Sequence, residues 1–373
     1  SFAQRAGSTS FLTFSGLPLP TEFRSLAFFL ALLGFGAKAG IVPLHVWLPE
    51  AHPVAPSHVS AVMSGVMIKT GIYGLLRVMQ WLGAPLWWWG PLLLAVGIVT
   101  GLIGILSALA QNDLKRLLAY CSVENIGIIV LGLGLAQYAS YERLPGVAAV
   151  ALAGALFHLF NHALSKSLLF LGAGIIRHAT GTLNLNQLGG LARRLQGVGG
   201  PMLLGSMAIA GLPPLNGFMG EFLIYMAAFQ GLLVLKGFAL LPMVCAIAGL
   251  ALIGGLASAC FAKVFGIAFL GEPRTTQAAI AHTPGWAMRR SILALALLCG
   301  LTALAVPLAL PLLAPVLIEV LKFDSGLMTD MLRSAGGLLG GLLAGGTLLM
   351  SLILLLAATR RHLLRGREMG TTG

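Results

Sequence analysis

Long, nearly uncharged apolar runs recur along this sequence and limit its possible folds more than any other feature. A helix needs roughly 20 mostly apolar residues to cross the hydrocarbon core of a bilayer. Runs of this length cover residues near 24–48, 57–81, 87–110, 116–138, 147–176, 198–231, 237–270, 290–320 and 336–358. A transmembrane β-barrel would show apolar and polar residues in alternation, and these runs do not. We therefore predict an all-α polytopic membrane protein with about nine transmembrane helices.

The charge balance agrees with a membrane protein, because charged residues make up only 9% of the chain. Soluble domains carry about 25%. The net charge of +12 could suggest nucleic acid in a soluble protein. Here the basic residues lie mostly between the apolar runs, which indicates that they set the membrane topology. We therefore predict the lipid bilayer as a partner and no nucleic acid.

Alternate connections between the runs differ in their content of basic residues. The richer set holds Lys115, Arg116, Arg177, Arg193, Arg194, Arg274, Arg289, Arg290, Arg360, Arg361, Arg365 and Arg367. The poorer set holds Arg5, Arg24, Arg77, Arg143, Lys236, Lys322 and Arg333. The positive-inside rule places the richer set in the cytoplasm. We predict a multi-pass protein of a prokaryotic cytoplasmic membrane with a cytoplasmic C-terminus.

No catalytic or cofactor-binding motif is readable in the sequence. The cysteines at 121, 245, 260 and 299 stand singly inside apolar runs, which is typical of small buried side chains and not of zinc or iron–sulfur ligands. There is no P-loop and no GxGxxG after a strand. Any redox or hydrolytic centre is therefore expected in a partner subunit.

Two apolar runs contain helix breakers near their middles, "GFGAKAGIVPLHVWLP" at 34–49 and "AGLPPLNGFMGEF" at 210–222. Proline removes a backbone donor and clashes with the preceding turn. Interrupted spans mark ion sites in many transporters, whereas a packing kink is the simpler alternative. Because each break has a charged residue beside it, Lys38 or Glu221, we favour an ion site.

Several ionisable residues fall within the apolar runs, where a charged side chain costs about 2.5–3.5 kcal/mol on insertion scales. They are Lys38, Lys69, Glu124, His158, His162, Lys166, Glu221 and Lys263. Such groups must be neutral, hydrated or paired, and each of these conditions suits proton movement. For Lys263 the alternative is snorkelling to the interface, and for Glu124 it is a structural hydrogen bond.

The stretch "LFHLFNHALSKSLLFLG" carries His158, His162 and Lys166 at steps of four residues. Residues at i, i+4 and i+8 lie on one helical face, about 5–6 Å apart per step. With water between them they would form a stepped proton relay. Metal ligation by the two histidines is the alternative, and it lacks a nearby carboxylate or thiolate ligand.

The segment "WLPEAHPVAPSH", with His45 just before it, joins the first two runs. His52 and His58 lie within it, and Glu50 is its carboxylate. We predict a solvated mouth at the cytoplasmic side, with a gating role as the alternative.

Four stretches together resemble the proton-translocating antiporter-like subunits of complex I, Mrp-type antiporters and membrane-bound hydrogenases. They are "KAGIVPLHVWLPEAHPVAPSHVSAVMSGVMIKTGIYGLLR", "NDLKRLLAYCSVENIG", "HLFNHALSKSLLFLGAG" and "GLPPLNGFMGEF". Within this family, "SVENIG" and "FAKVFGIAFLGEPR" are most similar to the hydrogenase-4 and formate hydrogenlyase subunit 3 branch.

The resemblance implies an inverted-repeat fold in which two broken helices frame a hydrophilic axis at mid-membrane height. Lys38 and Lys69 match its first lysines, and Glu221 matches the terminal group on the second broken helix. His158, His162 and Lys166 match the central relay. In the family, a glutamate upstream of Lys38 pairs with that lysine.

That glutamate is expected elsewhere on a longer chain or on another polypeptide, unless the protein no longer pumps. We accordingly divide the chain into an N-terminal segment (1–23), a core that forms the C-terminal part of the fold (24–320) and an extra helix with a basic cytoplasmic tail (321–373).

The leading hypothesis is a proton-translocating subunit of a membrane-bound nickel–iron hydrogenase. The expected partners are other membrane subunits and a peripheral hydrogenase-like arm that carries the nickel–iron and iron–sulfur centres, with no cofactor in this chain. A subunit of an Mrp-type cation/proton antiporter or of a complex I-like NADH–quinone oxidoreductase is the first alternative. A non-conducting membrane scaffold is the second.

Overall fold

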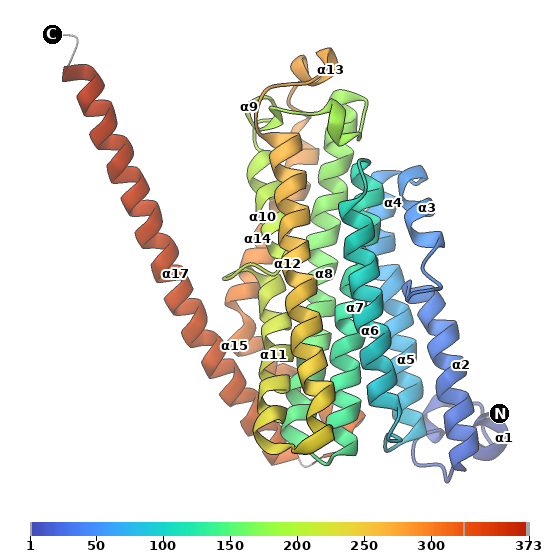
Figure 1. Ribbon diagram of the computed structural model, residues 1–373. Coiled ribbons are helices and arrows are strands. Elements are labelled where there is room, and N and C mark those ends of the chain that lie inside the picture. Colours follow the sequence, from blue (N-terminus) through green and yellow to red (C-terminus); the bar gives the residue numbers. More distant parts are fainter. Residues whose placement is uncertain (1, 324, 371–373) are drawn as a thin grey trace.

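The computed structural model describes residues 2–323 and 325–370, and its helices form a bundle from which one long helix diverges (Figure 1). The first half contains α1 (Phe2–Ala6), η1 (Phe11–Thr13), α2 (Thr21–Ala39), α3 (Trp47–Val54), α4 (Ser57–Val62), η2 (Met63–Met67), α5 (Ile68–Leu82), α6 (Trp89–Leu109), α7 (Leu114–Tyr141) and α8 (Pro145–Thr180). The second half contains η3 (Leu185–Gln187), α9 (Leu191–Arg194), α10 (Gly199–Ile209), α11 (Asn216–Val234), η4 (Gly237–Leu240), α12 (Leu241–Phe269), α13 (Thr276–Ala279), α14 (Trp286–Leu304), α15 (Val306–Leu312), α16 (Ala314–Leu321) and α17 (Ser325–Gly370).

The prediction of an all-α polytopic membrane protein is confirmed. Across the described ranges, 8 helical segments are long and apolar enough to cross a membrane, and α10 is a shorter apolar helix. No β-strand forms within these ranges; a single isolated bridge joins Asp113 to Asn184. The predicted span 290–320 is divided into α14, α15 and α16, because Pro307 and Pro315 each occupy the first turn of a new helix.

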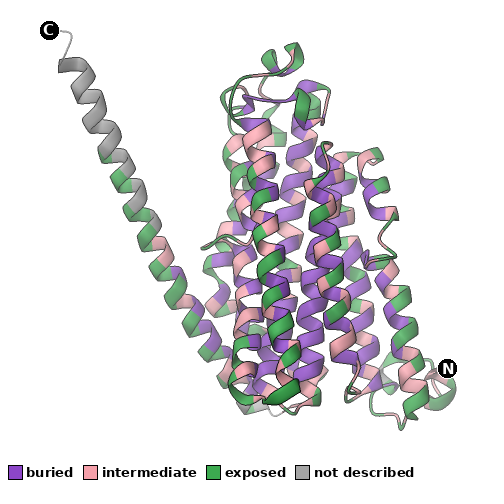
Figure 2. Ribbon diagram, in the orientation of Figure 1, coloured by how far each residue is buried: buried purple, intermediate pink, exposed green. Residues whose placement is uncertain are grey.

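The helices α7 and α8 form the buried centre of the bundle (Figure 2). Small residues let α6 approach α7 closely, since a Cβ atom on Gly127 would lie 2.3 Å from the Gly101 backbone nitrogen. Close backbone contact over glycines is a common way to pack membrane helices. This central pair places the polar residues of α7 and α8 far from lipid.

Both predicted helix breaks are present. The helix α2 ends at Gly40, whose φ of 86° is the left-handed conformation that closes many helices, and the axis resumes in α3. The second break separates α10 from α11, with Gly211 at a φ of 65°. Each break therefore replaces one predicted span by two half-helices.

The two alternating sets of connections lie at opposite ends of the bundle. At one end Arg116 pairs with Glu50 at 2.5 Å, and the short helices α9 and α13 lie at this same end (Figure 1). At the other end Arg77 lies 3.7 Å from Glu319. The bundle thus has two ends that differ in basic residues among the described connections.

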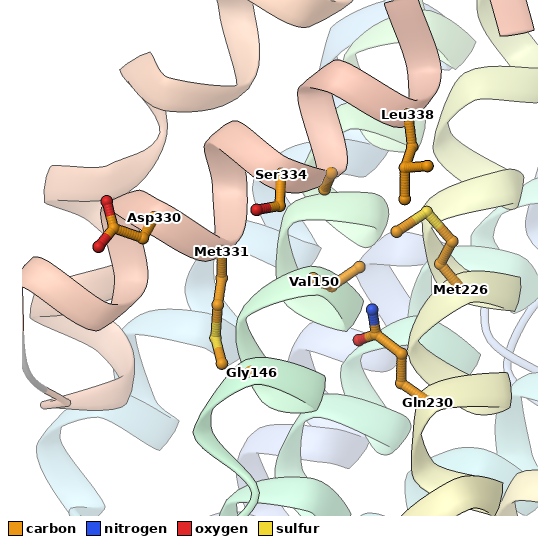
Figure 3. A pocket seen from close by; sticks show the side chains of 9 residues that line it. Gly146, Val150, Met226, Gln230, Asp330, Met331, Ser334 and Leu338 are labelled. Atoms are coloured by element: carbon orange, nitrogen blue, oxygen red, sulfur yellow. The ribbon is translucent and has the colours of Figure 1, made fainter. Parts of the chain in front are cut away.

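The long helix α17 packs against the bundle only through its first half and then leaves it (Figures 1 and 2). A cavity of about 300 Å³ remains between α17, α8 and α11 (Figure 3). There the Met331 thioether packs on Gly146, where a Cβ would lie 2.4 Å from the methionine methyl carbon. Of the predicted tail within 321–373, residues 324 and 371–373 and the side chains at 360, 361, 365 and 367 lie outside the described part of the chain.

Candidate functional site

Most of the ionisable residues predicted at mid-membrane gather in one buried region. Their exposed fractions are at most 7%, and they come from α5, α7, α8 and α11. They are Lys69, Glu124, His158, His162, Lys166 and Glu221. The structure thus brings together six of the eight predicted residues, which lie far apart in the sequence.

Lys69 contacts the central histidine of the α8 trio directly. Its Nζ lies 2.7 Å from His162 Nδ1 and donates to the Ser64 carbonyl at 2.5 Å. Ser64 belongs to η2, a π-helical turn between α4 and α5, and such turns occur frequently at functional sites. The turn redirects a backbone carbonyl toward the lysine, and nothing in the sequence pattern predicted it.

Lys166 is tied to the same place through α7. Its Nζ donates to the Leu118 carbonyl at 2.9 Å, and the Ser122 hydroxyl donates to that carbonyl at 3.0 Å. The Ser122 and Ser64 hydroxyls lie 2.8 Å apart. Two serines and a carbonyl therefore connect the Lys166 ammonium with the turn that binds Lys69.

His158 connects to Glu124 through an amide. Its Nε2 lies 3.0 Å from Asn125 Oδ1, and Asn125 Nδ2 donates to Glu124 Oε2 at 2.6 Å. Glu124 is also close enough to Lys166 to interact with it electrostatically. Ser122 and Asn125 were not among the predicted site residues, and the polar letters "SVEN" inside an apolar run were the available signal for them.

Glu221 lies on α11 at the second break, next to the residue at which α11 contacts His158. A Cβ atom on Gly220 would lie 2.6 Å from the His158 Cβ, so α11 and α8 touch at this residue. A Cβ on Gly211 would lie 2.8 Å from Glu221 Oε2, so the carboxylate faces the turn of the break. The helix break therefore makes room for Glu221 next to the histidine end of the trio.

Two predicted residues lie outside this region. Lys38 is exposed at the last turn of α2. Lys263 donates to the carbonyls of Leu109 and Gln111 at 2.8 and 2.9 Å, where its charge complements the C-terminal end of α6. This capping contact explains why a lysine lies near the end of α12 although it is not part of the buried cluster.

The buried region also contains ring nitrogens that have no hydrogen-bond partner in the described part of the chain. Within the described ranges, no group of three or more His, Cys, Asp or Glu side chains is arranged to hold a metal ion. The buried nitrogens His158 Nδ1 and His162 Nε2 have no hydrogen-bond partner among the described residues. Buried polar groups of this kind normally bind ordered water, which would link neighbouring members of the chain.

Comparison with known proteins agrees with the four sequence stretches. The family described as "NADH:quinone oxidoreductase/Mrp antiporter, TM" matches residues 5–240. Hydrogenase-4 component B of Escherichia coli (strain K12) is 47% identical over 307 residues, which are 81% of this chain and 45% of the relative. Formate hydrogenlyase subunit 3 of the same strain is 43% identical over 296 residues, 78% of this chain and 47% of the relative. The chain thus spans about half the length of these relatives.

The fold is also similar to that of solved structures. A chain of the Mrp complex from Dietzia sp. DQ12-45-1b aligns with a TM-score of 0.69 and 23% sequence identity, covering 92% of this chain and 66% of that one. At this identity the likeness concerns the fold alone. The helices of this chain therefore have a known type of membrane-protein fold.

Proposed function

Because the chain belongs to the NADH:quinone oxidoreductase/Mrp antiporter family, we propose that it is a proton-translocating membrane subunit of a membrane-bound nickel–iron hydrogenase complex. The two Escherichia coli relatives, by their names, support the hydrogenase assignment. Since the chain covers about half of each, the activity and the partners of these proteins are part of the proposal. The nickel–iron and iron–sulfur centres would belong to a peripheral arm, with no cofactor in this chain.

The observation that carries the proposal is the cluster of buried titratable groups, some of which are joined by hydrogen bonds. Lys69 and His162 share a hydrogen bond of 2.7 Å, in which one of the two nitrogens must act as acceptor. A proton can therefore transfer between the two side chains. Asn125 links His158 to Glu124. In the proposed mechanism, charge changes in the redox arm shift the proton affinity of these groups in turn, and Glu221 releases or receives the proton at the second break.

The membrane orientation follows from the same proposal. The end of the bundle with Lys115, α9 and α13 would face the cytoplasm of a prokaryote. The C-terminus would lie on this side as well, as the excess of basic residues there predicts.

A second candidate is a subunit of an Mrp-type antiporter or of a complex I-like oxidoreductase. The description of the matching family names both, which favours this class over unrelated transporters. Co-purification separates the candidates, since a nickel–iron subunit should accompany the tagged full-length chain only if the hydrogenase assignment is right.

The test of proton translocation uses Lys166→Ala and Glu221→Gln in the full-length chain within its native complex. Each change removes a titratable group from the buried region, and we expect proton transport in membrane vesicles to fall at least about tenfold. The matched control is Lys236→Ala, which removes an exposed lysine at the end of the bundle. Normal transport in both test variants would leave the scaffold hypothesis as the better account.

A further inference from the structure

A buried histidine outside the cluster has no assigned role. The side chain of His52, on α3, is 0% exposed, although α3 is a short half-helix beyond the first break. Neither His52 Nδ1 nor His52 Nε2 has a hydrogen-bond partner among the described residues. An unpaired buried polar atom costs about 1–3 kcal/mol, so two on one ring call for a binding partner.

The His52 ring is held in a fixed place against α8. It stacks on Phe170 with a centroid distance of 4.6 Å and an interplanar angle of 16°. Phe170 follows Lys166 by four residues and therefore lies one helical turn beyond it on the same face. On the other side, the Ser60 hydroxyl donates to the His52 carbonyl at 3.1 Å and fixes the turn between α3 and α4.

Two lysines lie near His52, one in the buried cluster and one at the end of the bundle. Lys166 of α8 and Lys115 of α7 are close enough to interact with the ring electrostatically. Lys115 donates to the Ala55 carbonyl at the end of α3 at 2.5 Å. The exposed Glu50–Arg116 pair lies at the same end of the bundle. His52 thus lies between the buried Lys166 and a solvated, basic end.

The chemistry of the ring suits transfer and not storage of a proton. The ring is fully buried and lies near the side chains of Lys166 and Lys115, and both conditions disfavour an imidazolium, so the resting imidazole is neutral. A neutral imidazole has one donor and one acceptor nitrogen. It can accept a proton on one side and release another from the opposite side, and ordered water can supply the partners that both nitrogens lack.

We propose that His52 is a proton-transfer residue that connects Lys166, through ordered water, to the solvated end of the bundle at Lys115 and Glu50. This proposal rests on the proposed proton translocation and adds the branch that joins the buried cluster to one membrane surface. During transfer the proton arriving at one ring nitrogen is matched by the proton leaving the other, so no net charge stays on the ring.

The test replaces His52 by Phe in the full-length chain within its native complex. Phenylalanine keeps the stack on Phe170 but cannot carry a proton, so we expect proton transport in vesicles to fall at least about tenfold. The control His282→Phe changes an exposed histidine in the connection between α13 and α14 and should stay within about twofold of wild type.

A second variant separates proton transfer from packing. His52→Ala opens a space at the ring, and external imidazole should restore transport at least about threefold if a titratable ring is what is missing. Transport by His52→Phe within about twofold of wild type would overturn the proposal. The proposal is also overturned if imidazole does not restore transport in an assembled His52→Ala complex. This second result decides the question even if the His52→Phe variant does not assemble.

The same vesicles distinguish a failure of the His52 branch from a failure of the proposed function. If Lys166→Ala abolishes transport while His52→Phe does not, only the His52 branch is wrong. If both variants transport protons normally, the proposed function itself fails.

Discussion

The two helix breaks look alike in sequence but differ in what surrounds their charged residue. At the first break Lys38 is exposed, whereas at the second Glu221 is 7% exposed. The second break packs against α8 at His158, whereas the two half-helices of the first, α2 and α3, pack mainly on α5 and α7. A break alone therefore does not place its charged residue in the buried cluster, since only Glu221 is buried there.

Side chains hydrogen-bond to the backbone at both breaks. At the first, Thr100 of α6 accepts from the Val42 backbone nitrogen at 3.2 Å, and the Trp47 indole donates to the Ala37 carbonyl at 2.9 Å. At the second, Asn161 of α8 donates to the Asn216 carbonyl at 2.6 Å. Such partners are required because lipid cannot satisfy the exposed backbone.

The largest difference between the breaks should be the loss of stability when a glycine at each break is replaced by alanine. At the second break, a Cβ on Gly217 would lie 1.8 Å from the Ala208 carbonyl oxygen, so Gly217→Ala must displace backbone. We expect a loss of at least about 3 kcal/mol of stability, measured as a fall in the thermal unfolding temperature of the purified protein.

The matched change at the first break is Gly36→Ala. A Cβ there would lie 3.3 Å from the end of the Ile41 side chain, which can shift by a few tenths of an ångström, and alanine in a helix is favoured over glycine by about 0.5–1 kcal/mol. Equal destabilisation by the two variants would show that the second break is not the more tightly packed one.

The next effect concerns the charged residues themselves. Glu221→Gln should lower proton transport about tenfold, because glutamine keeps the size but cannot release a proton. Lys38→Gln should lower it less, since no described member of the buried cluster contacts Lys38. Equal losses in the vesicle assay would indicate that another segment or subunit brings Lys38 into the path.

The smallest difference in stability is expected when the side chains that hydrogen-bond to the backbone at each break are replaced. Asn161→Leu removes the short hydrogen bond to the Asn216 carbonyl between two fully buried residues and should cost about 1.5 kcal/mol. Thr100→Val removes the acceptor of a longer, partly buried bond and should cost about 1 kcal/mol. Chemical unfolding of both variants checks the order, and a larger cost for Thr100→Val would reverse the comparison.

Much of the architecture could be predicted from local sequence. The apolar runs predicted the membrane helices because spanning length and hydrophobicity are properties of one segment. Glycine and proline predicted both breaks for the same reason, although the interruptions at Pro307 and Pro315 were not anticipated. The spacing of His158, His162 and Lys166 placed them on one face, since helical periodicity is fixed by backbone geometry.

The sequence by itself therefore determined which titratable residues lie in the apolar runs, and the tertiary structure decided which of them are buried and which of them meet. Lys69 and His162 are 93 residues apart, and their contact depends on how α5 packs on α8. The same packing left Lys38 on the surface and turned Lys263 to the end of α6. Pairing between helices depends on crossing geometry and close glycine contacts, which involve two segments at once and leave no periodic signal in either.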